Sequence, residues 1–432
     1  MALSQQTFII SAQGTSGDIY PLIGIGKELS ARGAHIIFLS NDRFCDLVKA
    51  EGFEHVSTGT VDNHNKLIRD ERFWMFGKGA GQITWPILGR SSLRTSYKYV
   101  KSVRTKFDKK PIIMCSNPSL NGAVWAAESF DLPVVHFILS PIVILSALSP
   151  SAPTKWLIPA WLPSGEKAKY FKNELNKQER RKLMKPHIRE ANQLRKKLGL
   201  SSIGKASVEM HLNPTFQQIA LFPPWYGEPA EDWPKQLTLT NFPLFNDVKP
   251  KSRSYVDKFI DSHGAPIIFS FGTGYTNVTS LIHIAWIVSD KLKLPCIFIG
   301  GDIEGVNIEI PNKCLHLNYA DFEYVFSKSL LAVHHGGIGT MSQAIQAGIP
   351  QLIRPTAFDQ FDNADKIKAL NLGDYLLEKE FTIERVASKI VALLESKKVA
   401  EAAHYYAIQI SKNNGIKESC DLIEKGLPSK DN

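Results

Sequence analysis

Cysteine is scarce in this sequence, since its 432 residues include only five cysteines and none of them forms a C-x-x-C pair. This scarcity excludes a disulfide-rich small protein and a structural zinc site, which needs clustered ligands. Scattered single thiols are typical of buried residues in a reducing compartment. Residues 1–6 do not resemble a secretory leader, so we expect a cytoplasmic protein.

Long hydrophobic runs are also rare. The longest extends from Leu132 to Leu148 and is interrupted by Pro133, His136 and Pro141. A helix that spans a membrane needs about 20 predominantly apolar residues. We therefore expect no membrane-spanning segment.

Several motifs that would assign the chain to another class are missing. There is no D-x-D metal motif, and no lysine follows a glycine-rich turn as it does in ATPases. The loop that begins at Gly14 lacks a G-x-G-x-x-G pattern, which argues against a nicotinamide-dependent dehydrogenase. No zinc-finger, RNA-recognition or helix-turn-helix pattern is present, so we expect no nucleic-acid partner.

Positive charge is concentrated in one segment. The chain has 51 Lys and Arg against 42 Asp and Glu, a net charge of +9. Residues 167–197 hold twelve basic and three acidic residues, which equals the whole excess. A basic helical segment of this kind is either a solvated surface or a peripheral contact with an anionic membrane.

Strand-like and helix-like segments alternate along the chain, as in parallel α/β sheets. The first strand is predicted over residues 7–12, and a glycine-rich loop separates it from a helix that Pro21 opens and Gly33 ends. A strand over 35–40 completes a βαβ unit. Two further strands and the helix between them are predicted over 111–115, 132–138 and 122–129.

A second α/β series follows a polar linker near residues 243–252. Its predicted strands cover 265–270, 295–300, 314–317, 331–335 and 350–354. We therefore predict two doubly wound Rossmann-like domains, over residues 1–245 and 246–432, that face each other across a cleft. The first domain carries a helical insertion at about 154–200, and the last helix of the second can return to the N-terminal domain.

The strongest local pattern is a strand, a glycine-rich turn and a helix over residues 333–350. Gly336, Gly337 and Gly339 let a ligand approach the backbone, because glycine has no Cβ. The amides of such a turn and the N-terminus of the helix form an anion site, to which His335 and Thr340 add hydrogen-bonding side chains. The pattern predicts a turn that binds a diphosphate.

The loop after the next strand adds the pair Asp359 and Gln360. Loops that follow neighbouring parallel strands lie at the same edge of the sheet. A carboxylate beside an amide offers the acceptors and donors that vicinal sugar hydroxyls need. The helix N-terminus and His335 can balance the charge of a diphosphate in place of a cation, so we expect no metal and no further cofactor.

These segments resemble the donor-binding region of family 1 nucleotide-sugar-dependent glycosyltransferases, which have the GT-B fold. That region typically runs H-x-G-x-G-T, A-x-x-x-G-x-P and P-x-x-x-D-Q-x-x-N-A, and here it covers 335–340, 344–350 and 355–364. The resemblance implies a hexosyltransferase that moves a sugar from a UDP- or dTDP-sugar to a hydroxyl group, with inversion of the anomeric centre and without a metal.

The resemblance also implies further donor contacts. Gly272 and Thr273, in the Phe-Gly-Thr-Gly turn, correspond to residues that touch the donor phosphates, and Tyr319 stands where an aromatic ring stacks on the base. An ordinary core tyrosine is the alternative at that position. Gln343 replaces a glutamate that uridine-preferring plant members use for the ribose, which leaves the choice between UDP and dTDP open.

The first loop, Gly14 to Pro21, is similar to the G-[ST]-x-G-D-x-x-P loop of bacterial and sterol-type members. The resemblance implies that Asp18 is the general base that takes the proton of the acceptor hydroxyl. It also places Gly14 and Thr15 beside the donor. The alternative for Asp18 is a cap on the helix that begins near Tyr20.

The chain as a whole resembles the rhamnosyltransferase subunit of bacterial rhamnolipid synthesis, and also sterol- and macrolide-type glycosyltransferases, notably over 221–226, 232–234 and 241–245. This implies a hydrophobic or lipid-like acceptor, in a pocket that includes His136 and Ser140, and a glycolipid product. A core role for His136 is the alternative. Other acceptor classes are a natural-product, sterol or flavonoid aglycone, and the basic segment 167–197 then permits peripheral contact with the inner face of an anionic membrane.

Two other functions remain open from the sequence. A nucleotide-sugar epimerase of the same fold is disfavoured by Asp359 and Gln360. A non-catalytic partner protein that only binds a nucleotide sugar predicts a disabled first loop, whereas Asp18 is present.

Overall fold

A computed structural model describes residues 3–74, 90–116, 121–144, 146, 189–202, 217–245, 250–272, 278–301 and 309–427. Contacts within the chain divide it into two compact units. Unit 1 holds residues 1–243 and 414–432, and unit 2 holds residues 244–413. The contacts thus separate the units near the expected linker and assign the C-terminal helix to unit 1.

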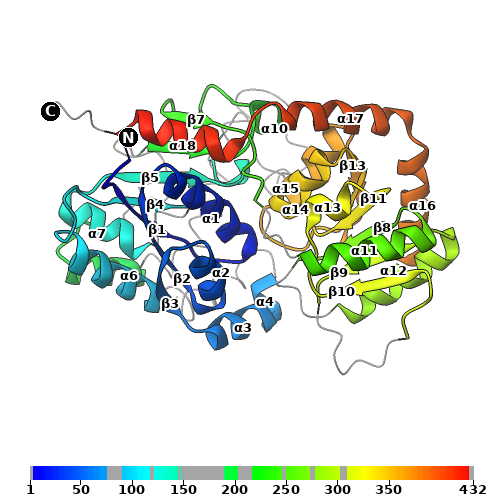
Figure 1. Cartoon of the computed structure of the whole chain (residues 1–432), viewed down its shortest axis with the longest axis horizontal. Coiled ribbons are helices and arrows are strands. Elements are labelled where there is room, and N and C mark those ends of the chain that lie inside the picture. Colours follow the sequence, from blue (N-terminus) through cyan, green and yellow to red (C-terminus); the bar gives the residue numbers. More distant parts are fainter. Residues whose placement is uncertain are drawn as a thin grey trace, which may run out of the picture. The chain divides into compact units, whose positions relative to one another are not determined.

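The sheet of unit 1 is parallel, with its strands in the order β3-β2-β1-β4-β5-β6-β7 (Figure 1). The order runs outward from β1 in both directions, so the winding reverses between β1 and β4. The strands are β1 (Thr7–Ser11), β2 (His35–Asn41), β3 (Glu54–Gly59), β4 (Ile112–Cys115), β5 (Val134–Ile138), β6 (Gln217–Ala220) and β7 (Leu237–Leu239).

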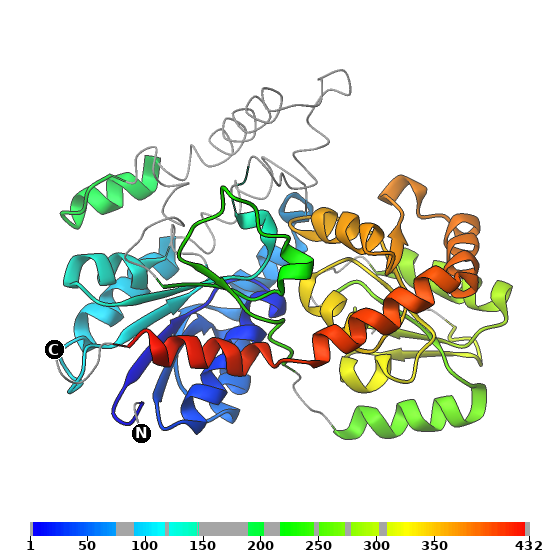
Figure 2. The ribbon, with the colours of Figure 1, turned by 90° about the horizontal axis from the view of Figure 1, so that it is seen from above.

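Helices cover both faces of this sheet. Ile9, Ile37 and Ile113 pack in one cluster with residues of α6 (Arg90–Val103) and α7 (Gly122–Phe130). On the other face, α1 (Ser16–Ala31) packs against α18 (Gly415–Lys425), as Figures 1 and 2 show. The shorter helices are η1 (Asp42–Phe44), α2 (Cys45–Ala50), α3 (Val61–Arg69), α4 (Glu71–Trp74), η3 (Pro141–Val143) and α10 (Pro224–Gly227).

Unit 2 repeats this winding with its strands in the order β10-β9-β8-β11-β12-β13, all parallel. Ile267 and Phe269 of β8 enter a cluster with α12 and α16, whereas Ile268 enters another with α11, α13 and α14. Burial on both faces explains the nearly continuous apolar strands. The strands are β8 (Ile267–Ser270), β9 (Cys296–Ile299), β10 (Cys314–Leu317), β11 (Leu331–His334), β12 (Gln351–Ile353) and β13 (Gly373–Tyr375). The helices are α11 (Pro250–His263), α12 (Thr279–Leu292), α13 (Phe322–Phe326), α14 (Ile338–Gln346), α15 (Gln360–Ala369), η6 (Glu378–Glu380), α16 (Ile383–Glu395) and α17 (Lys397–Ser411).

The predicted start of the first helix was wrong. Helix α1 begins at Ser16 with Thr15 as its N-cap, and Pro21 lies inside the helix. The sequence analysis placed Pro21 at the first helical position, where proline is common. The helix instead begins five residues earlier, where Asp18 supplies an acceptor to the first turn.

The basic segment lies mostly outside the described residues, as does the expected insertion. Residues 189–197 are helical, and their Arg195 is only 3% exposed. Arg195 forms an ion pair with Glu128 at 2.6 Å and lies over the ring of Trp125, 5.4 Å from its centroid. This arginine therefore belongs to the core rather than to a charged surface.

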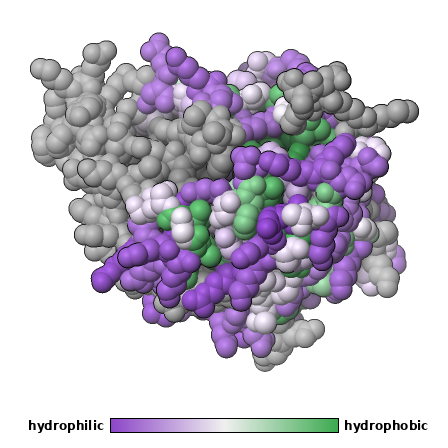
Figure 3. Space-filling model, turned by 90° about the vertical axis from the view of Figure 1, so that its left-hand side faces the viewer, coloured by the Kyte–Doolittle hydropathy of each residue, from purple (hydrophilic) through white to green (hydrophobic). Residues whose placement is uncertain are grey.

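Among the coloured residues on the side that Figure 3 displays, no broad apolar face is seen. Hydrophilic residues dominate there, and hydrophobic ones lie in small patches. Within the described part of the chain, no helix is long and apolar enough to cross a bilayer.

Candidate functional site

The candidate site of unit 2 lies where the winding of the sheet reverses. Strands β8 and β11 are neighbours at this point, with Ser270 paired to His334. Ligands of doubly wound sheets bind beyond the carboxyl ends of such strands. The turns at Gly272 and His335–Gly337, predicted separately from the sequence, leave the sheet at this point. Thr273 is outside the described residues.

The ring of His335 occupies space that two glycines leave open. A Cβ on Gly272 would lie 3.1 Å from both Cε1 and Nε2 of this ring, and a Cβ on Gly337 would lie 2.4 Å from Nε2. Burial lowers the pKa of His335 to about 4, although a contact with the backbone of Ser270 opposes the shift. The imidazole is therefore neutral near pH 7.

His334 ends strand β11 and is fully buried. Its Nδ1 accepts the N–H of Gly336 at 3.0 Å, so Nε2 carries the proton and donates it to Oε1 of Gln351 at 2.9 Å. Burial and the neighbouring His335 lower the pKa of His334 to about 3. Two adjacent histidines thus have separate tasks, since His334 holds the turn and His335 extends from it.

Helix α14 begins directly after this turn. Its N-cap, Gly337, provides no side-chain cap, so the amides of the first turn stay available for an anion. Thr340 is buried in that first turn, and Gly339 is exposed. A Cβ on Gly339 would meet no atom within 4 Å, so the space beside this residue is open.

The predicted pair Asp359 and Gln360 lies beside the same turn. Nδ2 of Asn363 donates to the carbonyl oxygen of Gly336 at 2.8 Å and to Oδ2 of Asp359 at 2.9 Å. Oε1 of Gln360 accepts the N–H groups of Thr356 at 2.8 Å and Ala357 at 3.0 Å. One oxygen of each side chain is therefore committed to holding the loop.

Two further residues of unit 2 belong to this edge of the sheet. Tyr319 is half-buried and follows β10, the strand at one end of the sheet. Gln343 lies one helical turn beyond Thr340 and is 8% exposed. Its Oε1 is buried and has no hydrogen-bond partner among the described groups, which marks it as an acceptor for a ligand.

In unit 1, Asp18 lies in the first turn of α1 and is half-buried. Its Oδ2 accepts the backbone N–H of Thr15 at 2.8 Å. Burial raises the pKa of Asp18 from 3.8 to about 6, and hydrogen bonds from Thr15 oppose this shift. Gly14 has a φ of +129°, and a Cβ there would lie 2.1 Å from Oδ2 of Asp18. The carboxylate therefore needs glycine at this position, and it caps the helix as well as facing the loop.

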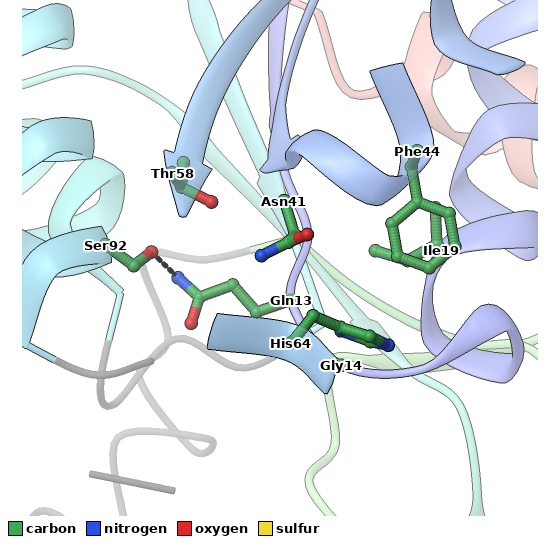
Figure 4. Close-up of a pocket in the computed structure, with 8 residues that line it drawn as sticks. All are labelled: Gln13, Gly14, Ile19, Asn41, Phe44, Thr58, His64 and Ser92. Atoms are coloured by element: carbon green, nitrogen blue, oxygen red, sulfur yellow. Dashed lines mark hydrogen bonds between the residues drawn. The ribbon is translucent and has the colours of Figure 1, made fainter. Parts of the chain in front are cut away.

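A small pocket lies beside this loop (Figure 4). Its walls come from the loop after β1 and from β2, β3, α1, α3, α6 and η1. The residues that line it are Gln13, Gly14, Ile19, Asn41, Phe44, Thr58, His64 and Ser92.

The expected acceptor residues lie elsewhere. His136 is inside strand β5, and only 1% of it is exposed. Ser140 is buried and precedes the short helix η3. The described part of the stretch that begins at Val134 forms a central strand and this helix, and none of its residues lines the pocket of Figure 4. The core alternative for His136 fits this placement.

The sequence analysis gave no role to His334, Asn363 or His64. Asn363 was visible in the P-x-x-x-D-Q-x-x-N-A pattern, but its contact with Gly336 depends on the fold. His64 had no signal, because the residues around it are far apart in the sequence. Among the described residues, no three His, Cys, Asp or Glu side chains are grouped to hold a metal.

Comparisons with known proteins point to one enzyme class. A domain-family profile described as "Erythromycin biosynthesis protein CIII-like, C-terminal domain" matches residues 308–414. The O-mycaminosyltylonolide 6-deoxyallosyltransferase of Streptomyces fradiae is 21% identical over 95% of this chain and 95% of its own length. The sterol 3-beta-glucosyltransferase of Saccharomyces cerevisiae strain YJM789 is 22% identical over 96% of this chain, which spans only 34% of that enzyme.

Solved structures show the same fold. The glycotransferase of kitacinnamycin superposes with a TM-score of 0.71 at 16% identity, over 98% of this chain and 99% of that one. The glycosyltransferase VinC, solved in complex with dTDP, superposes with a TM-score of 0.66 at 15% identity, over 97% of this chain and 98% of that one.

Proposed function

We propose that this chain, a family 1 glycosyltransferase with the GT-B fold, transfers a hexose from a UDP- or dTDP-sugar to a hydroxyl of a hydrophobic alcohol. The observation that carries the proposal is the uncapped helix α14 behind a glycine turn, with the neutral His335 seated between Gly272 and Gly337. Open amides at a helix N-terminus suit a diphosphate.

The donor would bind in unit 2. Amides of the first turn of α14, together with Thr340, face the phosphate oxygens, and His335 donates a neutral N–H to one of them. The unpaired Oε1 of Gln343 suits a ribose or sugar hydroxyl as donor. Asp359 and Gln360 would contact the sugar through their carboxylate and amide groups. Tyr319 supplies a ring for the base.

The transfer is a single displacement at the anomeric carbon. The acceptor oxygen forms a bond to that carbon as the bond to the diphosphate breaks, and the configuration inverts. Asp18 takes the hydroxyl proton, and the diphosphate leaves with the electron pair against the amides of α14. A carboxylate with a pKa of about 6 is ionised at pH 7 and is a stronger base than an exposed aspartate.

The relatives favour one of the acceptor classes expected from the sequence. They act on a macrolide and on sterols, by their names, which supports a natural-product or sterol-type alcohol. A lipid acceptor and peripheral membrane contact through residues 167–197 remain predictions. The neighbour solved with dTDP supports dTDP as one of the two donor carriers.

A donor panel tests this function. The purified chain is incubated with UDP- and dTDP-hexoses and with a macrolide aglycone, a sterol or decan-1-ol, and the products are analysed by mass spectrometry. The expected product gains one hexose and releases one nucleoside diphosphate, and NMR of its anomeric proton shows inversion. Binding of the donor without transfer to any acceptor would instead support a non-catalytic nucleotide-sugar-binding protein.

A further inference from the structure

The small pocket beside the Asp18 loop is lined by both polar and apolar side chains. Five of its eight lining residues carry hydrogen-bonding side chains, and none is charged. Ile19 and Phe44 are its apolar side chains (Figure 4). A site of this composition suits a neutral group that carries oxygen.

His64 is the residue whose state needs explaining. It comes from helix α3, and its ring meets the ring of Phe44 edge to face at 6.0 Å. Only 4% of His64 is exposed, and its Nδ1 is buried without a hydrogen-bond partner among the described residues. Because buried polar atoms are nearly always paired, the open Nδ1 points to a missing hydrogen-bond partner.

Most polar atoms of the side chains near His64 already have hydrogen-bond partners within the protein. Oδ1 of Asn41 accepts the N–H of Arg43 at 3.0 Å, and its Nδ2 donates to the carbonyl oxygen of Thr60 at 2.9 Å. Both polar atoms of the Asn41 side chain are thus bonded to the backbone, and they hold the wall of the pocket in place. Gln13 donates through Nε2 to the hydroxyl of Ser92, which leaves its amide oxygen for a ligand.

The charge of His64 restricts the ligand further. Burial, with a smaller effect of Arg43, lowers the pKa of His64 to about 4. The ring is therefore neutral at pH 7, and no charged side chain lines the pocket. A hydroxyl can donate a hydrogen bond to Nδ1, whereas a carboxylate has no proton to donate at pH 7.

The pocket adjoins the proposed base through one residue. Gly14 lines the pocket, and a Cβ on it would lie 2.1 Å from Oδ2 of Asp18. The pocket and the carboxylate of Asp18 therefore both adjoin Gly14.

We propose that this pocket receives a second oxygen function of the acceptor, close to the hydroxyl that reacts, and that His64 is a positioning residue that accepts a hydrogen bond from it. The inference rests on the proposed function and narrows the acceptor class. It favours an alcohol with two neighbouring oxygens over one with a single isolated hydroxyl.

Two acceptors that differ by one hydroxyl test the proposal, decane-1,2-diol and decan-1-ol. The wild-type chain should show at least a tenfold higher kcat/KM for the diol. In His64→Phe, which keeps a ring against Phe44, the ratio should fall below threefold. His64→Asn, whose amide oxygen can replace Nδ1, should restore part of the preference. His35→Phe, an exposed histidine outside the pocket, should keep the wild-type ratio.

An unchanged ratio in His64→Phe, or a wild-type chain that uses both alcohols equally, would overturn the role of His64. If neither alcohol is glycosylated, the proposed transfer has failed for these acceptors, and binding is then read separately. In that case the side-chain nitrogen shifts of His64 are followed by NMR during titration with each alcohol. A response to the diol alone upholds the pocket, and no response shows that it holds only water.

Discussion

Two neighbouring histidines illustrate how single residues divide the work of the candidate donor site. Both ring nitrogens of His334 form hydrogen bonds within the protein, one with Gly336 and one with Gln351. The ring of His335 lies against two glycines. Both are neutral because burial disfavours their charged forms. In the proposed donor site, dipoles and backbone amides rather than a resident positive charge would therefore face the diphosphate.

Asp18→Asn should separate catalysis from stability. The pKa of Asp18 is raised, so its proton stabilises the fold at low pH, and this stabilisation is lost as the pH rises from about 4 through 6. At pH 8 the free energy of unfolding of the neutral variant should exceed that of the wild type by about 1–3 kcal/mol. At pH 4 the two proteins should be equally stable. Urea unfolding at both pH values measures this.

The same variant should lose about 10²–10⁴-fold in kcat/KM, the usual contribution of a general base. For the wild type, kcat/KM should fall tenfold per pH unit below about pH 6, where Asp18 takes up its proton. Transfer that survives the substitution at full rate would rule out the assignment of the base.

Gly339→Ala tests whether a ligand occupies the space in front of α14. Its Cβ would meet nothing within 4 Å in the free protein, so the free energy of unfolding should change by less than about 1 kcal/mol. The KM for the nucleotide sugar should nevertheless rise at least tenfold. A stable variant with an unchanged KM would show that the donor lies elsewhere.

At the scale of elements, the site depends on how helix α15 is attached to the turn before α14. Asn363, fully buried on α15, donates to the carbonyl oxygen of Gly336 and to Asp359. This single amide connects two segments that the sequence analysis treated as separate contributors. It also explains why an asparagine stands three residues after Gln360.

Asn363→Asp should break this attachment. The substitution replaces an N–H donor with a carboxylate. This carboxylate would face a carbonyl oxygen and another carboxylate, and both would repel it. Unfolding should become easier by about 2–4 kcal/mol, and donor affinity should fall at least tenfold. Denaturant melts and calorimetric titration measure the two effects. Lys368→Gln, an exposed residue of α15, should change stability by no more than about 1 kcal/mol.

The sequence predicted the strongly apolar strands well and the short or polar strands poorly. Strands β1, β2, β8 and β11 were confirmed because apolar runs buried on both faces leave a clear pattern. The edge strands β3, β7 and β13 and the inner strand β6 escaped notice because they are short or polar, whereas the edge strand β10 was predicted. The start of α1 was misplaced because Pro21 gave a stronger signal than the cap formed by Thr15 and Asp18.

The candidate site divides in the same way. Glycine positions, His335 and Asp18 could be assigned from spacing and resemblance, since a turn before a helix has a local pattern. Other features depend on contacts between distant segments. These features are the hydrogen bonds by which His334 and Asn363 hold the turn, and the position of His64 in the wall of a pocket. No local pattern encodes these contacts.

For the whole molecule, the path of the C-terminus matters most. The chain leaves unit 2 after Asn413 and ends in unit 1, where Arg32 pairs with Asp421 at 2.6 Å. The backbone N–H of Asn241 donates to Glu418 at 2.7 Å. Helix α18 is thus part of the fold of unit 1, although it follows the whole of unit 2 in the sequence.

Gly415→Ala should therefore destabilise unit 1 rather than unit 2. A Cβ on Gly415 would lie 2.1 Å from the carbonyl oxygen of Asn241, so α18 must shift. We expect a loss of about 1–3 kcal/mol, the usual cost of overpacking, with faster hydrogen exchange in α1 and α18. The exposed Lys425→Ala should leave both unchanged. Faster exchange confined to unit 2 would refute this account of the C-terminus.

Calorimetric titration of the unliganded chain with UDP and with dTDP tests the central claim most directly. We predict that at least one of them binds with one molecule per chain, and that Gly337→Ala, whose Cβ would lie 2.4 Å from Nε2 of His335, weakens this binding at least tenfold. Failure of both nucleotides to bind, or equal affinity in Gly337→Ala, would contradict a diphosphate site at this turn.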